Sequence, residues 1–242
     1  HDMYYMNPPA KDLSKIASSD KVKKVQKDFE ATHVRPQRLM KTLFTDEAYV
    51  KANVDEARLM RRLFDLACNM QSHDTDMQLY SLFTDEECYD LWSCNNLYWY
   101  LTHACSPVTD GLMPYREADL LRNILDRADA ALKEGKNQAT LRFGHESCLL
   151  PLVALLELNH YGESYPDVEK LSEQWRAYDI FPMASNVQFV FFHKKGSNDV
   201  LVKVLLNEKE TKLPVKTDVA PYYHWKDVES YYREKLDKYQ HI

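Results

Sequence analysis

A histidine and a glutamate stand side by side where a short apolar segment gives way to an apolar run. The segment is Thr140 to Phe143, a glycine follows at Gly144, and His145 and Glu146 come next. In an open α/β sheet such a junction lies at the carboxyl edge of a strand, where ligands bind. An imidazole and a carboxylate presented there can bind an anion and transfer a proton. The pattern therefore predicts a catalytic or binding site.

The same residues also fit a purely structural interpretation. Gly144 can serve only as a turn residue, and Glu146 or Ser147 only as an acceptor for the free N–H groups at a helix start. His145 would then be a surface histidine without a chemical role. Residue types alone leave both interpretations open, because short motifs match by chance.

A longer stretch resembles a known family. Residues Arg142 to Leu152, RFGHESCLLPL, resemble the second signature of the histidine acid phosphatases, which include phytases and multiple inositol polyphosphate phosphatases. That signature is a strand ending in Gly-His-Asp or in His-Ala-Glu, followed by a Leu-rich segment. Phe181 to Phe192 and Asp199 to Glu208 resemble the next two strands of the family, and Thr32 to Phe44 resembles its helical cap.

The resemblance implies hydrolysis of phosphate monoesters, extending to inositol phosphates, through a phosphohistidine. By that resemblance, His145 would contact the phosphoryl group and stabilise its charge. Glu146 would protonate the leaving oxygen and then activate the water that hydrolyses the phosphohistidine. For Arg142 we expect a structural or ion-pair role, because side chains three residues apart in a strand point to opposite faces. Phosphate binding is the alternative role for Arg142.

The chain departs from the family pattern in two places. The family opens with Arg-His-Gly-x-Arg-x-x-Pro, whose histidine is the nucleophile, and the 242 residues contain no Arg-His-Gly. We therefore expect the carboxyl-terminal part of a longer protein, with the nucleophile outside this chain. The inositol-phosphatase pattern also places its glutamate one residue later, where this chain has Ser147. Glu146 and Ser147 thus compete for the position of the acid.

Two other functions stay open at this point. The first is a non-catalytic binding or inactive module that retains the phosphatase fold, which the missing nucleophile favours. The second is a helical interaction protein in which the sequence Gly-His-Glu is incidental. An Arg-His-Gly sequence upstream would favour the enzyme, and a sheet that continues beyond the strands of this chain would argue against the interaction protein.

Composition restricts the partners. A formal net charge of −6 argues against nucleic acid, which requires a basic surface. The longest nearly apolar run, Cys148 to Leu156, is far shorter than the stretch of about 20 residues that spans a bilayer. The five cysteines show neither C-x-x-C spacing nor histidines in zinc order, so we expect no metal and no cofactor. The expected ligand is a small phosphorylated substrate, and the resemblance implies a periplasmic or secreted protein. The sequence does not predict the oligomeric state.

The order of elements predicts an α/β fold. Residues 1–112 are expected to form a mostly helical cap, and residues 113–242 the C-terminal part of an α/β sandwich with an incomplete sheet. Residues 1–19 read as a connecting segment. Helices are expected over Asp20 to Glu30, from a Thr45 cap to about Met70, from a Thr84 cap to about Ala104, over Glu117 to Lys133 and over Trp225 to about Tyr239.

Strands are expected in the second half of the chain. Thr140 to Phe143 should be an interior parallel strand, because it feeds an apolar helix. Val187 to Phe192 and Val200 to Leu206 should form a hairpin, extended by a short strand around Thr211 to Val215. In the helix that follows Thr84, core packing is expected for the aromatic residues and a structural role for the histidine: Tyr89, Trp92, Tyr98, Trp99, Tyr100 and His103.

Overall fold

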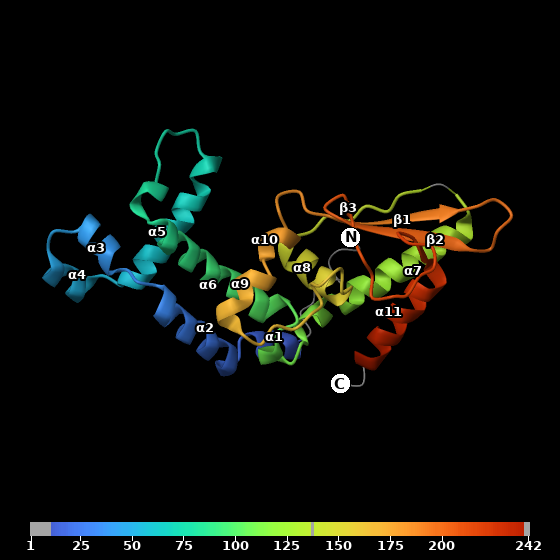
Figure 1. Cartoon of the computed structure of the whole chain (residues 1–242), viewed down its shortest axis with the longest axis horizontal. Coiled ribbons are helices and arrows are strands. Elements are labelled where there is room, and N and C mark those ends of the chain that lie inside the picture. Colours follow the sequence, from blue (N-terminus) through green and yellow to red (C-terminus); the bar gives the residue numbers. More distant parts are fainter. Residues whose placement is uncertain (1–10, 137, 240–242) are drawn as a thin grey trace. The chain divides into compact units, whose positions relative to one another are not determined.

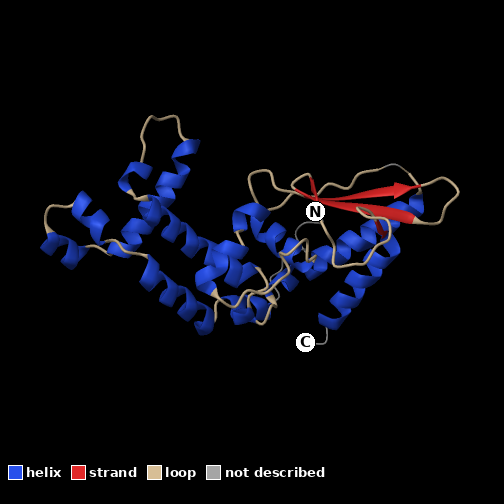
Figure 2. Cartoon of the chain, viewed as in Figure 1, coloured by secondary structure: helices blue, strands red, loops and turns tan. Residues whose placement is uncertain are grey.

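The computed structural model describes residues 11–136 and 138–239, and in them it combines many helices with a small antiparallel sheet (Figure 1). This agrees with the predicted α/β class. The chain divides into two compact units: a helical unit, Lys23–Tyr98, and a mixed unit that contains His1–Val22 and Trp99–Ile242. The strands of the described residues all lie in the mixed unit (Figure 2). The predicted domain division after residue 112 remains a prediction.

The helical unit is built on a small apolar core. It contains α3 (Gln37–Leu43), α4 (Glu47–Asn53) and α5 (Glu56–Asn69), the larger parts of α2 (Asp20–His33) and α6 (Asp85–His103), and the short 3₁₀ helices η1 (Met70–Ser72) and η2 (Tyr80–Leu82). The buried side chains of this core cluster are Val34, Leu39, Met40, Val50, Met60, Ala67, Phe83 and Leu91. Removal of these apolar groups from water is the main source of stability for the unit.

The start of α6 confirms the predicted Thr84 cap. The Oγ1 atom of Thr84 accepts a hydrogen bond from the Glu87 amide at 3.2 Å, and the Glu87 carboxylate accepts one from the Thr84 amide at 2.9 Å. This reciprocal pair is a capping box. Glu87 also accepts a hydrogen bond from Arg38 Nε at 2.7 Å, which ties α3 to the start of α6.

The predicted helix from Thr45 to Met70 is wrong, because the chain forms two helices there. Asp46 caps α4 by accepting a hydrogen bond from the Tyr49 amide at 2.9 Å, and the helix ends at Asn53. Asp55 then caps α5 by accepting one from the Arg58 amide at 3.0 Å. An aspartate side chain that satisfies a first-turn amide favours a helix start, so the second aspartate interrupts the helix.

Two further expectations need correction. Residues 1–19 are not only a connection, because α1 spans Lys11–Ala17; the first ten residues lie outside the described part of the chain. The aromatic residues of α6 are not all core residues. Tyr100 is fully buried, but Tyr89 and Tyr98 are 52% and 45% exposed, since leucines fill much of the buried face of that helix.

The hairpin of the mixed unit forms as predicted. β1 (Val187–His193) pairs with β2 (Val200–Leu206) in antiparallel register, from Val187 opposite Leu206 to His193 opposite Val200. β3 (Lys209–Glu210) and β4 (Tyr223–His224) both pair with β2, also antiparallel. A third strand is therefore present, but it lies at Lys209–Glu210 and not at the predicted Thr211 to Val215.

Backbone conformation explains why that third strand comes early. Asn207 and Glu208 both have positive φ, 52° and 61°. A two-residue turn with positive φ at both positions matches the right-handed twist of its flanking strands. The chain therefore reverses directly after β2 and pairs at once, two residues before Thr211.

Two long helices belong to the same unit as this sheet. α7 (Ala118–Glu134) ends at Gly135, whose φ of 66° provides the left-handed C-terminal residue, and α11 spans Trp225–Tyr239, so both helices confirm the prediction. α11 packs against β2 and α7 (Figure 1). The remaining elements of the unit are η3 (Pro107–Thr109), η4 (Met113–Glu117), α8 (Glu146–Leu155), η5 (Val168–Lys170), α9 (Leu171–Gln174) and α10 (Ala177–Ile180).

Thr140 to Phe143 forms no strand with the described residues, and pairing with the predicted neighbour outside this chain stays a prediction. Leu141 and Phe143 are 75% and 80% exposed. A strand requires a neighbouring strand to satisfy its backbone N–H and C=O groups, and the described residues pair none with this segment.

Candidate functional site

The predicted pair lies at the start of α8. His145 is the N-cap residue, with extended backbone angles of φ −118° and ψ 163°, and Glu146 is the first helical residue. The His145 carbonyl oxygen accepts hydrogen bonds from the amides of Cys148 and Leu149, both at 3.0 Å. The side chains of His145 and Glu146 are exposed. The structure therefore brings both predicted residues to one helix terminus, open to solvent.

The helix terminus adds to the electrostatics of this pair. The first backbone N–H groups of a helix have no carbonyl partner within it, and together with the helix dipole they favour a nearby negative charge. The first amide that donates to the His145 carbonyl is that of Cys148, so the amides of Glu146 and Ser147 lie before it in the chain. A histidine and a carboxyl group at such an end can hold an anion and deliver a proton to it.

Arg142 bonds to a neighbouring helix. Its Nη2 atom donates a hydrogen bond of 2.7 Å to the Asn123 side-chain oxygen on α7. This contact anchors the extended segment before α8 to α7. It supports the structural role that we favoured for Arg142 over phosphate binding.

A buried acid lies close to the start of α8, and the sequence did not reveal it. Glu117, the last residue of η4, is 1% exposed and hydrogen bonded to the Cys148 side chain. Burial, which disfavours the charged form, raises the pKa of Glu117 to about 7, and the positive charge of Arg116 and the Cys148 contact act against that shift. At the start of a predicted helix an acidic residue looks like an ordinary partner of the helix dipole, so no pattern signalled its burial.

His103 has the structural role expected of it. Its ring packs on Trp99, with centroids 4.7 Å apart, and its Nδ1 atom lies 2.7 Å from Thr102 Oγ1. Burial, assisted by the charge of Arg116, lowers the pKa of His103 to about 4. It is therefore a neutral packing residue over most of the pH range.

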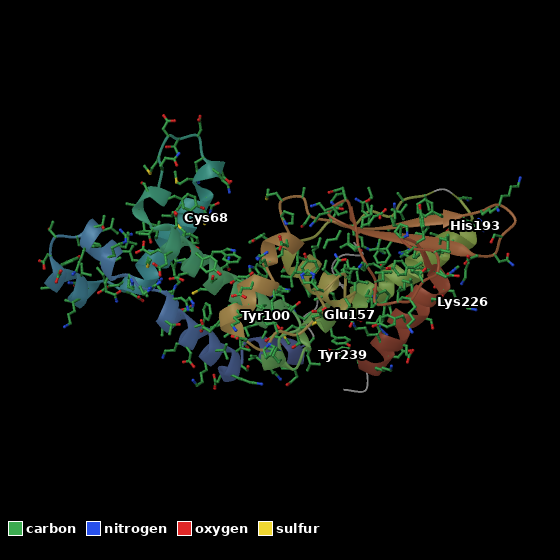
Figure 3. All side chains as sticks on the ribbon, in the orientation of Figure 1. Cys68, Tyr100, Glu157, His193, Lys226 and Tyr239 are labelled. Atoms are coloured by element: carbon green, nitrogen blue, oxygen red, sulfur yellow. The ribbon has the colours of Figure 1, made fainter. Side chains whose placement is uncertain are left out.

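A separate pocket lies toward the other end of α8. It has a volume of about 560 Å³, and its lining includes Tyr115, Leu155, Glu157 and Lys235 but neither His145 nor Glu146. Glu157 (labelled in Figure 3) accepts a hydrogen bond from the Tyr231 hydroxyl at 2.6 Å and pairs with Lys235 Nζ at 2.9 Å. Because these polar groups already satisfy one another, the pocket offers a ligand little unsatisfied charge.

The described residues hold neither a metal centre nor a membrane span. No group of three or more His, Cys, Asp and Glu side chains there is arranged to hold a metal ion. Within the same part of the chain, no helix has both the length and the apolar character needed to cross a membrane.

A family model described as the histidine phosphatase superfamily (branch 2) matches residues 3–207. Multiple inositol polyphosphate phosphatase 1 from Homo sapiens is 28% identical over 134 residues, which are 50% of this chain and 27% of the human protein.

Solved structures of the multiple inositol polyphosphate phosphatase of Bifidobacterium longum have a similar fold. The match to its phosphate complex has a TM-score of 0.64 at 19% identity. It covers 93% of this chain and 55% of the bacterial one. The complex with inositol hexasulfate has a TM-score of 0.58 at 18% identity, over 90% and 53% of the two chains. The chain thus spans about half the length of the solved relatives and about a quarter of the human one.

Proposed function

The chain belongs to branch 2 of the histidine phosphatase superfamily, and we propose from this that it supplies the general acid of an enzyme that hydrolyses phosphate monoesters. The observation that carries the proposal is the exposed pair His145 and Glu146 at the start of α8. A helix N-terminus favours the negative charge of a phosphoryl group, and a proton donor beside it can protonate the leaving oxygen.

The two residues have different roles in the proposed reaction. A histidine nitrogen from an Arg-His-Gly segment outside these residues attacks phosphorus while the bond to the ester oxygen breaks. Glu146 transfers its proton to that leaving oxygen and, as a carboxylate, then takes a proton from the water that attacks the phosphohistidine. The imidazole of His145 donates a hydrogen bond to a phosphoryl oxygen and stabilises the charge that develops there.

Inositol phosphates are the substrate class that we propose. The human and bacterial relatives are named for inositol polyphosphates, and a relative was crystallised with inositol hexasulfate, whose sulfates stand in for phosphates. The net charge of −6 means that such a polyanion needs a local positive site, not a basic surface. We propose the start of α8, where the helix dipole favours negative charge, as that site.

The exposed segment before α8 favours pairing with a strand outside this chain. Leu141 and Phe143 are apolar and 75% and 80% exposed, whereas Arg142 between them bonds to Asn123. This alternation is that of a strand with one face covered. We propose that a strand carrying the nucleophilic histidine pairs here in the longer protein.

A non-catalytic module of the same fold is the second candidate. Two observations favour it: the 242 residues contain no Arg-His-Gly, and Ser147 stands where the inositol-phosphatase pattern has its glutamate. Such a module would bind a phosphorylated ligand at the start of α8 without turning it over. Localisation in the periplasm or outside the cell is part of the enzyme proposal, by family resemblance only.

Turnover of p-nitrophenyl phosphate tests the proposal. The isolated 242-residue chain should show none, because a general acid without a nucleophile cannot form the phosphohistidine. A longer chain that includes an Arg-His-Gly segment should be active, and His145→Ala should lower its kcat by about 10²-fold or more. The matched control is His73→Ala, which removes an exposed histidine of the helical unit and should change nothing. Robust turnover by the isolated chain would refute the proposal, and an inactive longer chain would favour the binding module.

A further inference from the structure

Glu117 is a buried acid whose side chain is only partly satisfied. It is 1% exposed, and although it precedes α7 its side chain makes no capping hydrogen bond. Its Oε2 atom is buried without a hydrogen-bond partner. The carboxyl group is hydrogen bonded to the Cys148 side chain, in the first turn of α8. A carboxylate in this position would keep its charge out of water with little compensation.

The charges around Glu117 do not neutralise it. On its own element the half-buried Arg116 acts on it, and on α8 the Cys148 thiol does. α1 and α7 also pack against η4. Within the described residues, no titratable group of α1 or α7 is among those that shift the pKa of Glu117. The protonated acid is therefore the form that fits the site, since a neutral carboxyl group loses least on burial.

We propose that Glu117 is a pH-dependent positioning residue for the start of α8. As a neutral acid it packs beneath Cys148 and holds the first helical turn. As a carboxylate it draws water or moves toward it, which loosens that turn and the residues it positions, His145 and Glu146. The proposal concerns the helix itself, so it can be tested without any enzymatic activity.

The pKa gives the direction and the pH window. Burial raises the pKa of Glu117 from 4.5 to about 7, so the folded state binds the proton more tightly than the unfolded state. Stability then falls as pH rises from about 4.5 to about 7, and the full penalty applies above pH 7. A difference of 7 minus 4.5 corresponds to at most roughly 300-fold in the opening equilibrium.

Hydrogen exchange at the start of α8 tests the proposal directly. The reporters are the amides of Cys148 and Leu149, which donate to the His145 carbonyl. Their protection factors are measured in the 242-residue chain at pH 5.5 and 8.5, for wild type and Glu117→Gln. Comparison with the variant at each pH cancels the effects of other titrating groups. The ratio of wild-type to variant protection should fall by up to roughly 30-fold between the two pH values, because about a tenfold part of the roughly 300-fold change lies below pH 5.5.

Asp119→Asn is the matched control, because it neutralises an exposed acid two residues further along the chain. It should leave the pH dependence of wild type unchanged. Should Glu117→Gln fail to fold, the carbon resonance of the Glu117 carboxyl group in wild type is titrated instead. A midpoint near pH 7 supports the proposal. A midpoint near 4.5, or a Glu117→Gln variant that keeps the wild-type pH dependence, overturns it.

Discussion

The Tyr232 hydroxyl donates a hydrogen bond of 2.7 Å to the backbone carbonyl of Leu156. Tyr232 and Leu156 are both fully buried. The bond joins the middle of α11 to the residue that follows α8, so the last helix of the chain fixes the far end of the helix that begins at the candidate site.

Tyr232→Phe should destabilise the chain by about 1–2 kcal/mol, because it leaves the Leu156 carbonyl buried without its donor while the packing of the ring is kept. Urea unfolding followed by tryptophan fluorescence measures the change. Tyr49→Phe is the control, since that side chain is 54% exposed and its loss of a hydroxyl should cost almost nothing. Equal effects of the two substitutions would contradict the role given to this bond.

Gly162 is required by the conformation of Glu157. A Cβ atom at position 162 would lie 2.5 Å from Glu157 Cγ and 2.9 Å from its Cα, and Glu157 has a φ of 53°. Gly162→Ala should therefore cost about 1–3 kcal/mol in the free energy of unfolding through overpacking. Thermal unfolding in a single buffer is a sufficient measurement.

Gly111→Ala separates steric crowding from backbone strain. Gly111 has a φ of 69°, but nothing lies within 4 Å of the position that a Cβ atom would take there, so only the cost of the left-handed backbone applies. We expect a smaller loss than for Gly162→Ala. A Gly162→Ala protein as stable as wild type would show that Glu157 moves aside without cost.

His224 should make stability depend on pH. Its Nδ1 atom lies 3.0 Å from the Asp199 carboxylate and its Nε2 atom 3.0 Å from Asp218, so the imidazolium donates to both. These hydrogen bonds, first to Asp199 and then to Asp218, raise the pKa of His224 above 6.5. Because the folded-state pKa is the higher one, the contribution is complete below 6.5 and is lost as pH rises through the folded-state value.

The measurement is the melting temperature of wild type and His224→Asn at pH 5.5 and at pH 8.5. The variant should be less stable than wild type at pH 5.5, and the difference should shrink at pH 8.5. His73→Asn, which changes an exposed histidine, should track wild type at both pH values. A difference that stays constant with pH would mean that His224 acts through packing and not through its charge.

Local signals in the sequence predicted the elements that need only neighbouring residues to form. The Gly135 end of α7 and the Thr84 cap of α6 are of this kind, and both are present. The same holds for the hairpin of β1 and β2, whose strands are close in sequence. His145 and Glu146 were placed at a helix start for the same reason.

Elements that depend on distant partners could not be predicted in this way. Thr140 to Phe143 has the composition of a strand, yet it remains unpaired because no described strand of this chain lies beside it. The break at Asp55 is local, but hydrophobic periodicity does not reveal it, because it depends on a second capping aspartate. Glu117 was missed because its burial comes from the packing of η4 against α8.

The dependence of kcat on the leaving group tests most directly whether Glu146 is the general acid. Glu146→Gln is made in a chain that carries an Arg-His-Gly segment upstream, with Ser147→Ala as its matched control. kcat is measured for an alkyl phosphate, whose leaving oxygen needs a proton, and for p-nitrophenyl phosphate, whose leaving group needs little help.

We predict that Glu146→Gln lowers kcat on the alkyl phosphate by about 10² to 10⁴-fold, on p-nitrophenyl phosphate by much less, and leaves substrate binding nearly unchanged. Ser147→Ala should affect both substrates little and equally. Equal losses on both substrates for Glu146→Gln, or a selective loss on the alkyl phosphate for Ser147→Ala, would contradict the assignment of Glu146 as the acid.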